Sequence, residues 1–159
     1  MAALGAVMVV LVSGGGGDSG RKEERILERV CSEPPRATVE NFMAVRLPPS
    51  AQVAQIDCKG FTDTFVRARV DVPRTELDTL ISGANFSGPL RPGYRPFADT
   101  ATDTLGWKVD AIVSVAGHEE RCLSAKDVAA CATGLAGRRV MVDLDDPARA
   151  VVYLEAFTS

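Results

Sequence analysis

Two stretches of alternating apolar and polar residues constrain the fold of this chain most strongly. In residues 64–72 every second side chain is small and apolar: Val66, Ala68, Val70 and Val72. Because successive side chains of a strand point to opposite faces, this pattern predicts a strand with one buried face. Residues 138–144 and 150–157 alternate in the same way around a five-residue loop, residues 145–149, which predicts a C-terminal β-hairpin.

Further periodic segments predict the rest of the domain. Residues 52–58 and 108–116 have strand patterns, while residues 21–31 and 124–133 have helical spacing. Residues 38–47 also have helical spacing, with a strand as the competing interpretation. Another helix is expected to begin at Pro73 and to end at Gly83 or Asn85. Together they predict a two-layer α+β domain, with a mainly antiparallel sheet of four or five strands and helices on one face.

The N-terminus predicts export. Residues 1–12 form a continuous apolar run, which as a helix would be about 18 Å long against a hydrocarbon core of roughly 30 Å. Residues 1–14 are therefore expected to be a signal peptide or a membrane-anchoring segment, with an apolar element docked on the domain as the alternative. Four glycines follow, so residues 15–20 are expected to be a flexible tether, and residues 21–159 a single globular domain.

The cysteine content fits an exported protein with two disulfides, formed by Cys31, Cys58, Cys122 and Cys131. Proximity in the chain favours Cys31–Cys58 and Cys122–Cys131, each contributing about 2–4 kcal/mol. The alternative is four reduced thiols in a cytoplasmic protein. A zinc site that includes His118 is not expected, because closely spaced Cys-x2–4-Cys pairs are absent from the sequence.

Composition argues against several activities. The 18 basic and 21 acidic residues give a net charge of −3, so nucleic acid is not the expected partner. His118 is the only histidine, which excludes two-histidine metal sites. Beside Glu119 and Glu120, or with Asp110, His118 could act as a general base, although a surface loop histidine is the more frequent case.

Other motifs give no support for an enzyme. The sequence contains no Gly-x-Ser-x-Gly motif, which would indicate a serine hydrolase. It also contains no phosphate-binding glycine loop after a predicted strand. The aspartates Asp143, Asp145 and Asp146 could bind calcium, but Asp-Asp-Pro is a common turn. We therefore assign no catalytic residue, no metal and no cofactor from the sequence.

The best candidate for binding is the long segment 86–107, which is rich in glycine, proline and aromatic residues. Aromatic and arginine side chains dominate binding hot spots. The candidate binding residues are Phe86, Arg91, Tyr94, Arg95, Phe97 and Trp107. The competing interpretation is that the aromatic residues form a small satellite core under the loop.

Six short motifs are spread over most of the domain. They are Leu47-Pro48-Pro49-Ser50, Val70-Asp71-Val72-Pro73-Arg74, Phe86-Ser87-Gly88-Pro89-Leu90, Gly106-Trp107, Val142-Asp143-Leu144-Asp145-Asp146-Pro147 and Val151-Val152-Tyr153-Leu154-Glu155. In combination the chain resembles uncharacterised small secreted or lipoprotein-like proteins of actinobacteria. That resemblance implies export and no known activity. Gly14-Gly15 stands where the lipid-carrying cysteine of a lipoprotein signal would be.

These observations together predict a non-enzymatic binding domain outside the cytoplasm, secreted or attached to the cell membrane. Its expected partner is an envelope protein or a cell-wall component, bound through residues 86–107. Two alternatives remain open: an envelope hydrolase that uses His118 with a nearby carboxylate, and a cytoplasmic interaction protein.

Overall fold

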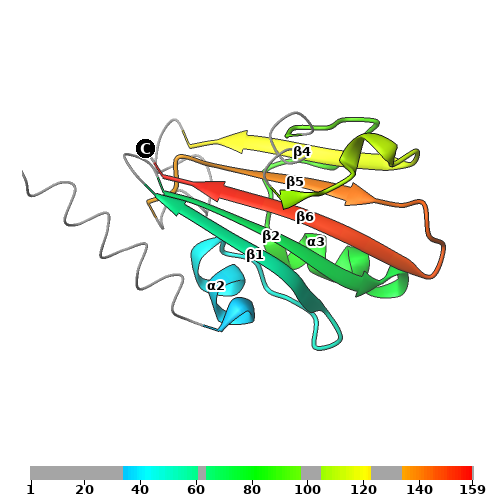
Figure 1. Ribbon diagram of the computed structural model, residues 1–159, viewed down its shortest axis with the longest axis horizontal. Coiled ribbons are helices and arrows are strands. Elements are labelled where there is room, and N and C mark those ends of the chain that lie inside the picture. Colours follow the sequence, from blue (N-terminus) through cyan, green and yellow to red (C-terminus); the bar gives the residue numbers. More distant parts are fainter. Residues whose placement is uncertain (1–33, 61–63, 98–104, 123–133, 159) are drawn as a thin grey trace, which may run out of the picture.

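A six-stranded antiparallel sheet forms the centre of the computed structural model (Figure 1). The strand order is β1-β2-β6-β5-β4-β3. The structure describes residues 34–60, 64–97, 105–122 and 134–158. The expected signal segment 1–14, the tether 15–20 and the expected helices 21–31 and 124–133 lie outside these residues.

The chain order of the elements is α2, β1, β2, η1, α3, β3, η2, β4, β5 and β6. The strands are β1 (Gln52–Gly60), β2 (Thr64–Pro73), β3 (Arg91–Pro92), β4 (Val115–Arg121), β5 (Gly137–Asp143) and β6 (Arg149–Phe157). The helices are α2 (Pro35–Phe42) and α3 (Leu77–Ala84), with two 3-10 turns, η1 (Arg74–Glu76) and η2 (Val109–Ala111).

The α+β class and the antiparallel sheet are confirmed, as are the strands predicted from alternation at β1, β2, β5 and β6. Four or five strands are too few, because the two-residue strand β3 lies within the segment expected to be a loop. The predicted helix 38–47 is shifted: α2 starts at Pro35, whose fixed φ suits a first helical position. Asn85 ends α3 in the left-handed conformation, with φ 48°.

The strand predicted over residues 108–116 is wrong. This segment instead forms η2, and β4 begins only at Val115. Val109 and Ile112 are both buried, while Val113 is 85% exposed. The apolar residues therefore follow a tight turn rather than a pleated strand, and alternation in sequence alone could not distinguish the two.

The helices and the sheet enclose the main core on one face. Helices α2 and α3 lie on this face (Figure 1), and the inward side chains of β2, β5 and β6 pack against them. Val66, Ala68, Val70 and Val72, predicted to share a face, are all buried in this core. Val39 of α2 and Leu80 of α3 are fully buried against them. We call this side of the sheet the helix face.

A smaller core covers part of the opposite face. It joins Met141 and Tyr153 of the sheet to a segment that runs from Leu105 to Ile112 and includes η2. Trp107 packs on Tyr153 with ring centroids 4.9 Å apart, and its indole nitrogen donates to Gln55 at 2.8 Å. We call this group the satellite core, and the side that carries it the open face.

Arg138 ties both helices to the sheet from within the helix face. Its side chain is 2% exposed. The guanidinium donates to the carbonyl oxygens of Met43 at 3.2 Å, Ala84 at 2.8 Å and Asn85 at 3.2 Å. These carbonyls lie at the C-terminal ends of α2 and α3, where the helix dipole favours a cation. Glu120 balances the charge by accepting from Arg138 Nε at 2.7 Å.

The two cysteines in the described residues lie on strands that are far apart. Cys58 is on β1 and Cys122 directly follows β4, with three strands between them. Four strand spacings amount to about 19 Å, well beyond the roughly 7 Å that a disulfide spans between Cα atoms. A Cys58–Cys122 bond is therefore excluded, and the pairing with Cys31 and Cys131 stays a prediction.

We expect Arg138→Met to destabilise the domain by about 3–5 kcal/mol, because Glu120 would be left buried without its cation. Urea unfolding followed by circular dichroism measures this loss. The matched control is Arg121→Met on β4, whose side chain is 69% exposed and which should cost less than about 1 kcal/mol. Equal losses in the two variants would contradict this role for Arg138. Adding Glu120→Gln to Arg138→Met should restore part of the stability.

Candidate functional site

The structure separates the six residues that the sequence indicated for binding. Phe97 and Trp107 are each 3% exposed and belong to the satellite core. Their ring centroids are 6.4 Å apart. Arg95 lies beside them and donates to the backbone oxygens of Val109, at 2.6 Å, and Ile112. These three residues hold the segment around η2 on the sheet, so they build the fold rather than present a surface.

Phe86 lies on the other side of the sheet. The guanidinium of Arg138 is 4.6 Å from the centre of its ring, and the imidazole of His118 is 5.6 Å away. Phe86 is only partly exposed and packs against the main core. It therefore cannot share a contact surface with residues on the open face.

Arg91 and Tyr94 are the two members of the set that form an accessible pair. Arg91 is exposed, and its guanidinium stacks 3.6 Å from the centre of the Tyr94 ring. The Tyr94 hydroxyl donates to Glu119 at 3.0 Å. Both ends of the tyrosine are thus held before any partner arrives, which lowers the entropy lost on binding. We call Arg91 and Tyr94 the edge pair, because Arg91 begins the edge strand β3 and Tyr94 follows it.

A row of alternating charges supports the edge pair. The register aligns one residue from each of five neighbouring strands on the open face, in the order Asp57, Arg67, Glu155, Arg139 and Glu119. Glu155, 1% exposed, accepts from Arg67 at 2.5 Å and from Arg139 at 2.9 Å. Arg139 also reaches Glu119, at 3.2 Å. We call this row the charge ladder; it runs across the sheet to Tyr94.

The charge ladder keeps Glu119 ionised. Burial raises the pKa of Glu119, but the hydrogen bond from Tyr94 and the positive charge of Arg139 lower it more, leaving it below its usual range. An ionised Glu119 is the stronger acceptor for the Tyr94 hydroxyl. The sequence carried a signal for this row, since Arg67, Arg139 and Glu155 occupy outward positions of their strands, but it did not show the strand order that aligns them.

His118 lies in β4 rather than in the surface loop favoured from sequence, and only 12% of its side chain is exposed. Its Nε2 is 3.5 Å from Ser87 Oγ and 3.6 Å from Glu120 Oε2. Glu119 points to the opposite face of the same strand, and Asp110 belongs to η2 on that face. Of the carboxylates considered from sequence, the structure brings only Glu120 to His118.

The arrangement around His118 does not favour an activated serine. Serine and carboxylate approach the same imidazole nitrogen, whereas a nucleophile and an orienting acid need the two different nitrogens. Burial raises the pKa of Glu120, but hydrogen bonds from Ser87 and Arg138 lower it more, so it lies below its usual range. An anionic Glu120 favours a proton on Nε2, where His118 cannot accept one from Ser87.

The hairpin aspartates serve the turn. Asp145 accepts from the backbone of Val113 at 2.9 Å and of Ser114 at 2.6 Å, and these bonds hold its pKa below the usual range. Asp146 accepts from Ala148 at 2.7 Å. Within the described ranges, no group of three or more His, Cys, Asp or Glu side chains is placed to hold a metal ion.

Comparison with protein families, with curated proteins and with solved structures finds no match for this chain. None of the helices in the described part of the chain is long and apolar enough to cross a membrane. The site must therefore be interpreted from its own geometry.

Two substitutions separate core residues from surface residues within segment 86–107. Trp107→Ala should cost about 3–5 kcal/mol, because it empties the centre of the satellite core. Tyr94→Ala should cost less, about 1.5–3 kcal/mol, the value of a hydrogen bond to a charged group. Urea unfolding measures both, with Tyr94→Phe as the control that keeps the ring. A Tyr94→Ala loss as large as that of Trp107→Ala would assign Tyr94 to the core.

Proposed function

We propose that this chain is a non-enzymatic binding domain of the cell envelope, which contacts an envelope protein or a cell-wall component through the edge pair. The observation that carries the proposal is the preorganised Tyr94, stacked by Arg91 and fixed by Glu119. Tyrosine and arginine are the residue types most enriched at binding hot spots. The charge ladder behind the pair provides a rigid support on the sheet.

The extracytoplasmic location rests on the sequence. An apolar run without charges followed by four glycines is typical of an exported domain on a tether. Two disulfides suit the same compartment, since they persist in an oxidising environment. The resemblance to small secreted actinobacterial proteins supports the same assignment. Attachment to the membrane would then come from the N-terminal segment.

The observation that would favour a hydrolase is the contact between Ser87 and His118. We rank that function second, because Glu120 approaches the same imidazole nitrogen as Ser87 and is itself held in an ion pair with Arg138. A cytoplasmic interaction protein is the third candidate, and it requires reduced cysteines.

We expect the purified protein to co-sediment with the envelope fraction of its native host, and Arg91→Ala and Tyr94→Ala to reduce the bound amount at least tenfold. The matched control is Arg46→Ala, an exposed arginine near the C-terminus of α2. His118→Ala should bind like the unchanged protein if the function is not enzymatic. Co-sedimentation unaffected by either edge variant would overturn the assignment of the edge pair, and no sedimentation at all would overturn the binding function.

Location and oxidation state are tested by intact mass. The protein recovered from the membrane fraction or the medium of the native host should be shortened near Gly14 and should gain about 4 Da on reduction, as two disulfides require. Peptide mapping without reduction should then recover Cys31–Cys58 and Cys122–Cys131. A full-length cytoplasmic species with four free thiols would instead favour the third candidate.

A further inference from the structure

A hollow of about 270 Å³ opens on the open face, at the hairpin end of the sheet. It is lined by Arg69, Asp71, Asp143, Asp145, Asp146, Arg149 and Val151. The register places Val151 of β6 directly between Asp71 of β2 and Asp143 of β5. Val151 is therefore an apolar floor with a charged wall on either side, and the two wall strands are about 10 Å apart.

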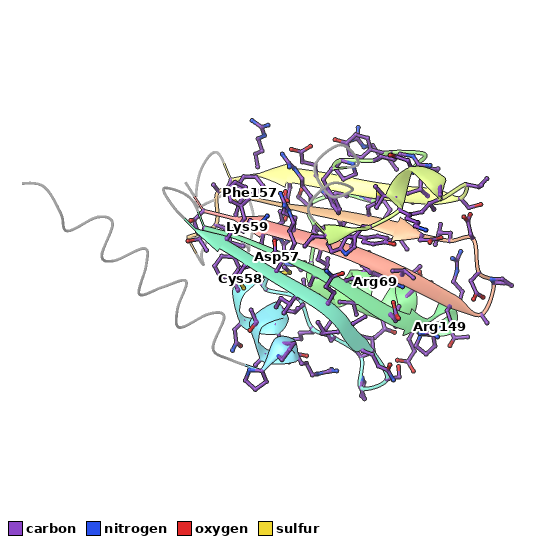
Figure 2. The ribbon with its side chains drawn as sticks, viewed as in Figure 1. Asp57, Cys58, Lys59, Arg69, Arg149 and Phe157 are labelled. Atoms are coloured by element: carbon purple, nitrogen blue, oxygen red, sulfur yellow. The ribbon has the colours of Figure 1, made fainter. Side chains whose placement is uncertain are left out.

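One wall carries a positive charge in excess. Asp71 lies between two arginines: its Oδ2 is 3.2 Å from Arg149 Nη2, and its Oδ1 is 3.4 Å from Arg69 Nε. A single carboxylate thus balances two guanidiniums. Figure 2 shows Arg149 toward one end of the strands, and Arg69 farther along the same face. The side chains of Arg69 and Arg149 are 40% and 59% exposed, so both can reach a ligand.

The other wall is negative. Asp143, Asp145 and Asp146 accept hydrogen bonds from backbone N–H groups of the turn and of the segment before β4. Backbone dipoles are the main support of these carboxylates, and the positive charge of Arg95 makes a smaller contribution at Asp145. Asp143 and Asp146 each use only one carboxylate oxygen in this way. The second oxygen of each remains an acceptor for a donor in the hollow.

In the part of the chain that the structure describes, incomplete hydrogen bonding of enclosed side chains is found at this end of the sheet. Among the described residues, three enclosed side-chain atoms have no hydrogen-bond partner: Arg69 Nε, Asp71 Oδ1 and Arg74 Nη1. Two of them belong to the positive wall, and the third lies at the end of the same strand. Arg69 Nε and Asp71 Oδ1 face each other at 3.4 Å as an ion pair without hydrogen-bond geometry, so this wall holds its charges less tightly than most enclosed polar atoms are held.

We propose that the hollow binds a small zwitterion, in which an ammonium and a carboxylate are joined by a short aliphatic chain. The ammonium faces Asp143 and Asp146, the carboxylate faces Arg69 and Arg149, and the aliphatic chain lies on Val151. A purely cationic ligand would leave the surplus guanidinium unused, and a purely anionic ligand would face three aspartates. This site is separate from the edge pair and does not depend on it.

The experiment titrates the full-length protein with 4-aminobutyrate, while NMR follows the amides of Val113, Ser114 and Arg149. Butylamine and butyrate are the matched probes that carry only one of the two charges. We expect saturable shifts with 4-aminobutyrate in the millimolar range, and binding at least tenfold weaker with either single-charge probe. The affinity should fall with added salt, because exposed charges are screened.

Two conservative variants test the walls separately. Arg69→Gln and Asp143→Asn should each weaken the binding of 4-aminobutyrate at least tenfold. The amide oxygen introduced by Asp143→Asn would still accept the turn hydrogen bond from the backbone of Asp145. Arg46→Gln, on the helix face, is the control and should bind like the unchanged protein.

Two results would overturn the proposal. Equal affinity for butylamine and 4-aminobutyrate would indicate a merely acidic surface. Absence of saturable shifts, or shifts that map elsewhere on the domain, would show that the hollow is not a binding site for a zwitterion.

Discussion

The buried guanidinium of Arg138 is the contact on which the arrangement of this domain depends. Two short helices, each of eight residues, would be marginal on their own. Each ends over the same strand, and the side chain of Arg138 on β5 donates hydrogen bonds to carbonyl oxygens at both ends. Because those carbonyls have no partner within a helix, Arg138 replaces bonds that water would otherwise supply. The helices are thereby fixed relative to the sheet and to each other.

A buried cation requires a buried anion, and this second requirement organises β4. Glu120 lies opposite Arg138 in the register and is 5% exposed. Its other oxygen accepts from the backbone of Ser87 at 2.8 Å, which fixes the start of the segment after α3. His118 then lies between Ser87 and Glu120. The position of His118 is therefore better explained by its packing between these two side chains than by a catalytic role, even though serine, histidine and glutamate are residue types that a hydrolase uses.

The sequence predicted those parts of the fold in which side-chain period and burial agree. In β2 the alternation Val66, Ala68, Val70 matches the buried face residue by residue. In β5 the alternation no longer matches the burial. Met141 occupies an outward position but is fully buried, because the satellite core covers it. Arg138 is also at an inward position, where charge would not be expected. Such residues depend on segments that reach the sheet from elsewhere in the chain, and local pattern carries no information about them.

The same reasoning explains why the six candidate binding residues do not form one site. Aromatic and arginine residues in segment 86–107 have the composition of a hot spot, but composition cannot show which rings fold inward. Trp107 donates to Gln55, more than fifty residues away in the chain, and so belongs to the core.

Tyr94 has its partner at the edge of the sheet and stays accessible. The satellite core thus separates two charged surfaces on one face, with the edge pair on one side and the zwitterion hollow on the other. Strand residues contribute to both surfaces, Arg91 of β3 to the edge pair and Asp71 and Asp143 of β2 and β5 to the hollow, and backbone hydrogen bonds fix the turn aspartates beside them. Each surface can therefore present charges in a fixed geometry, which lowers the cost of recognition.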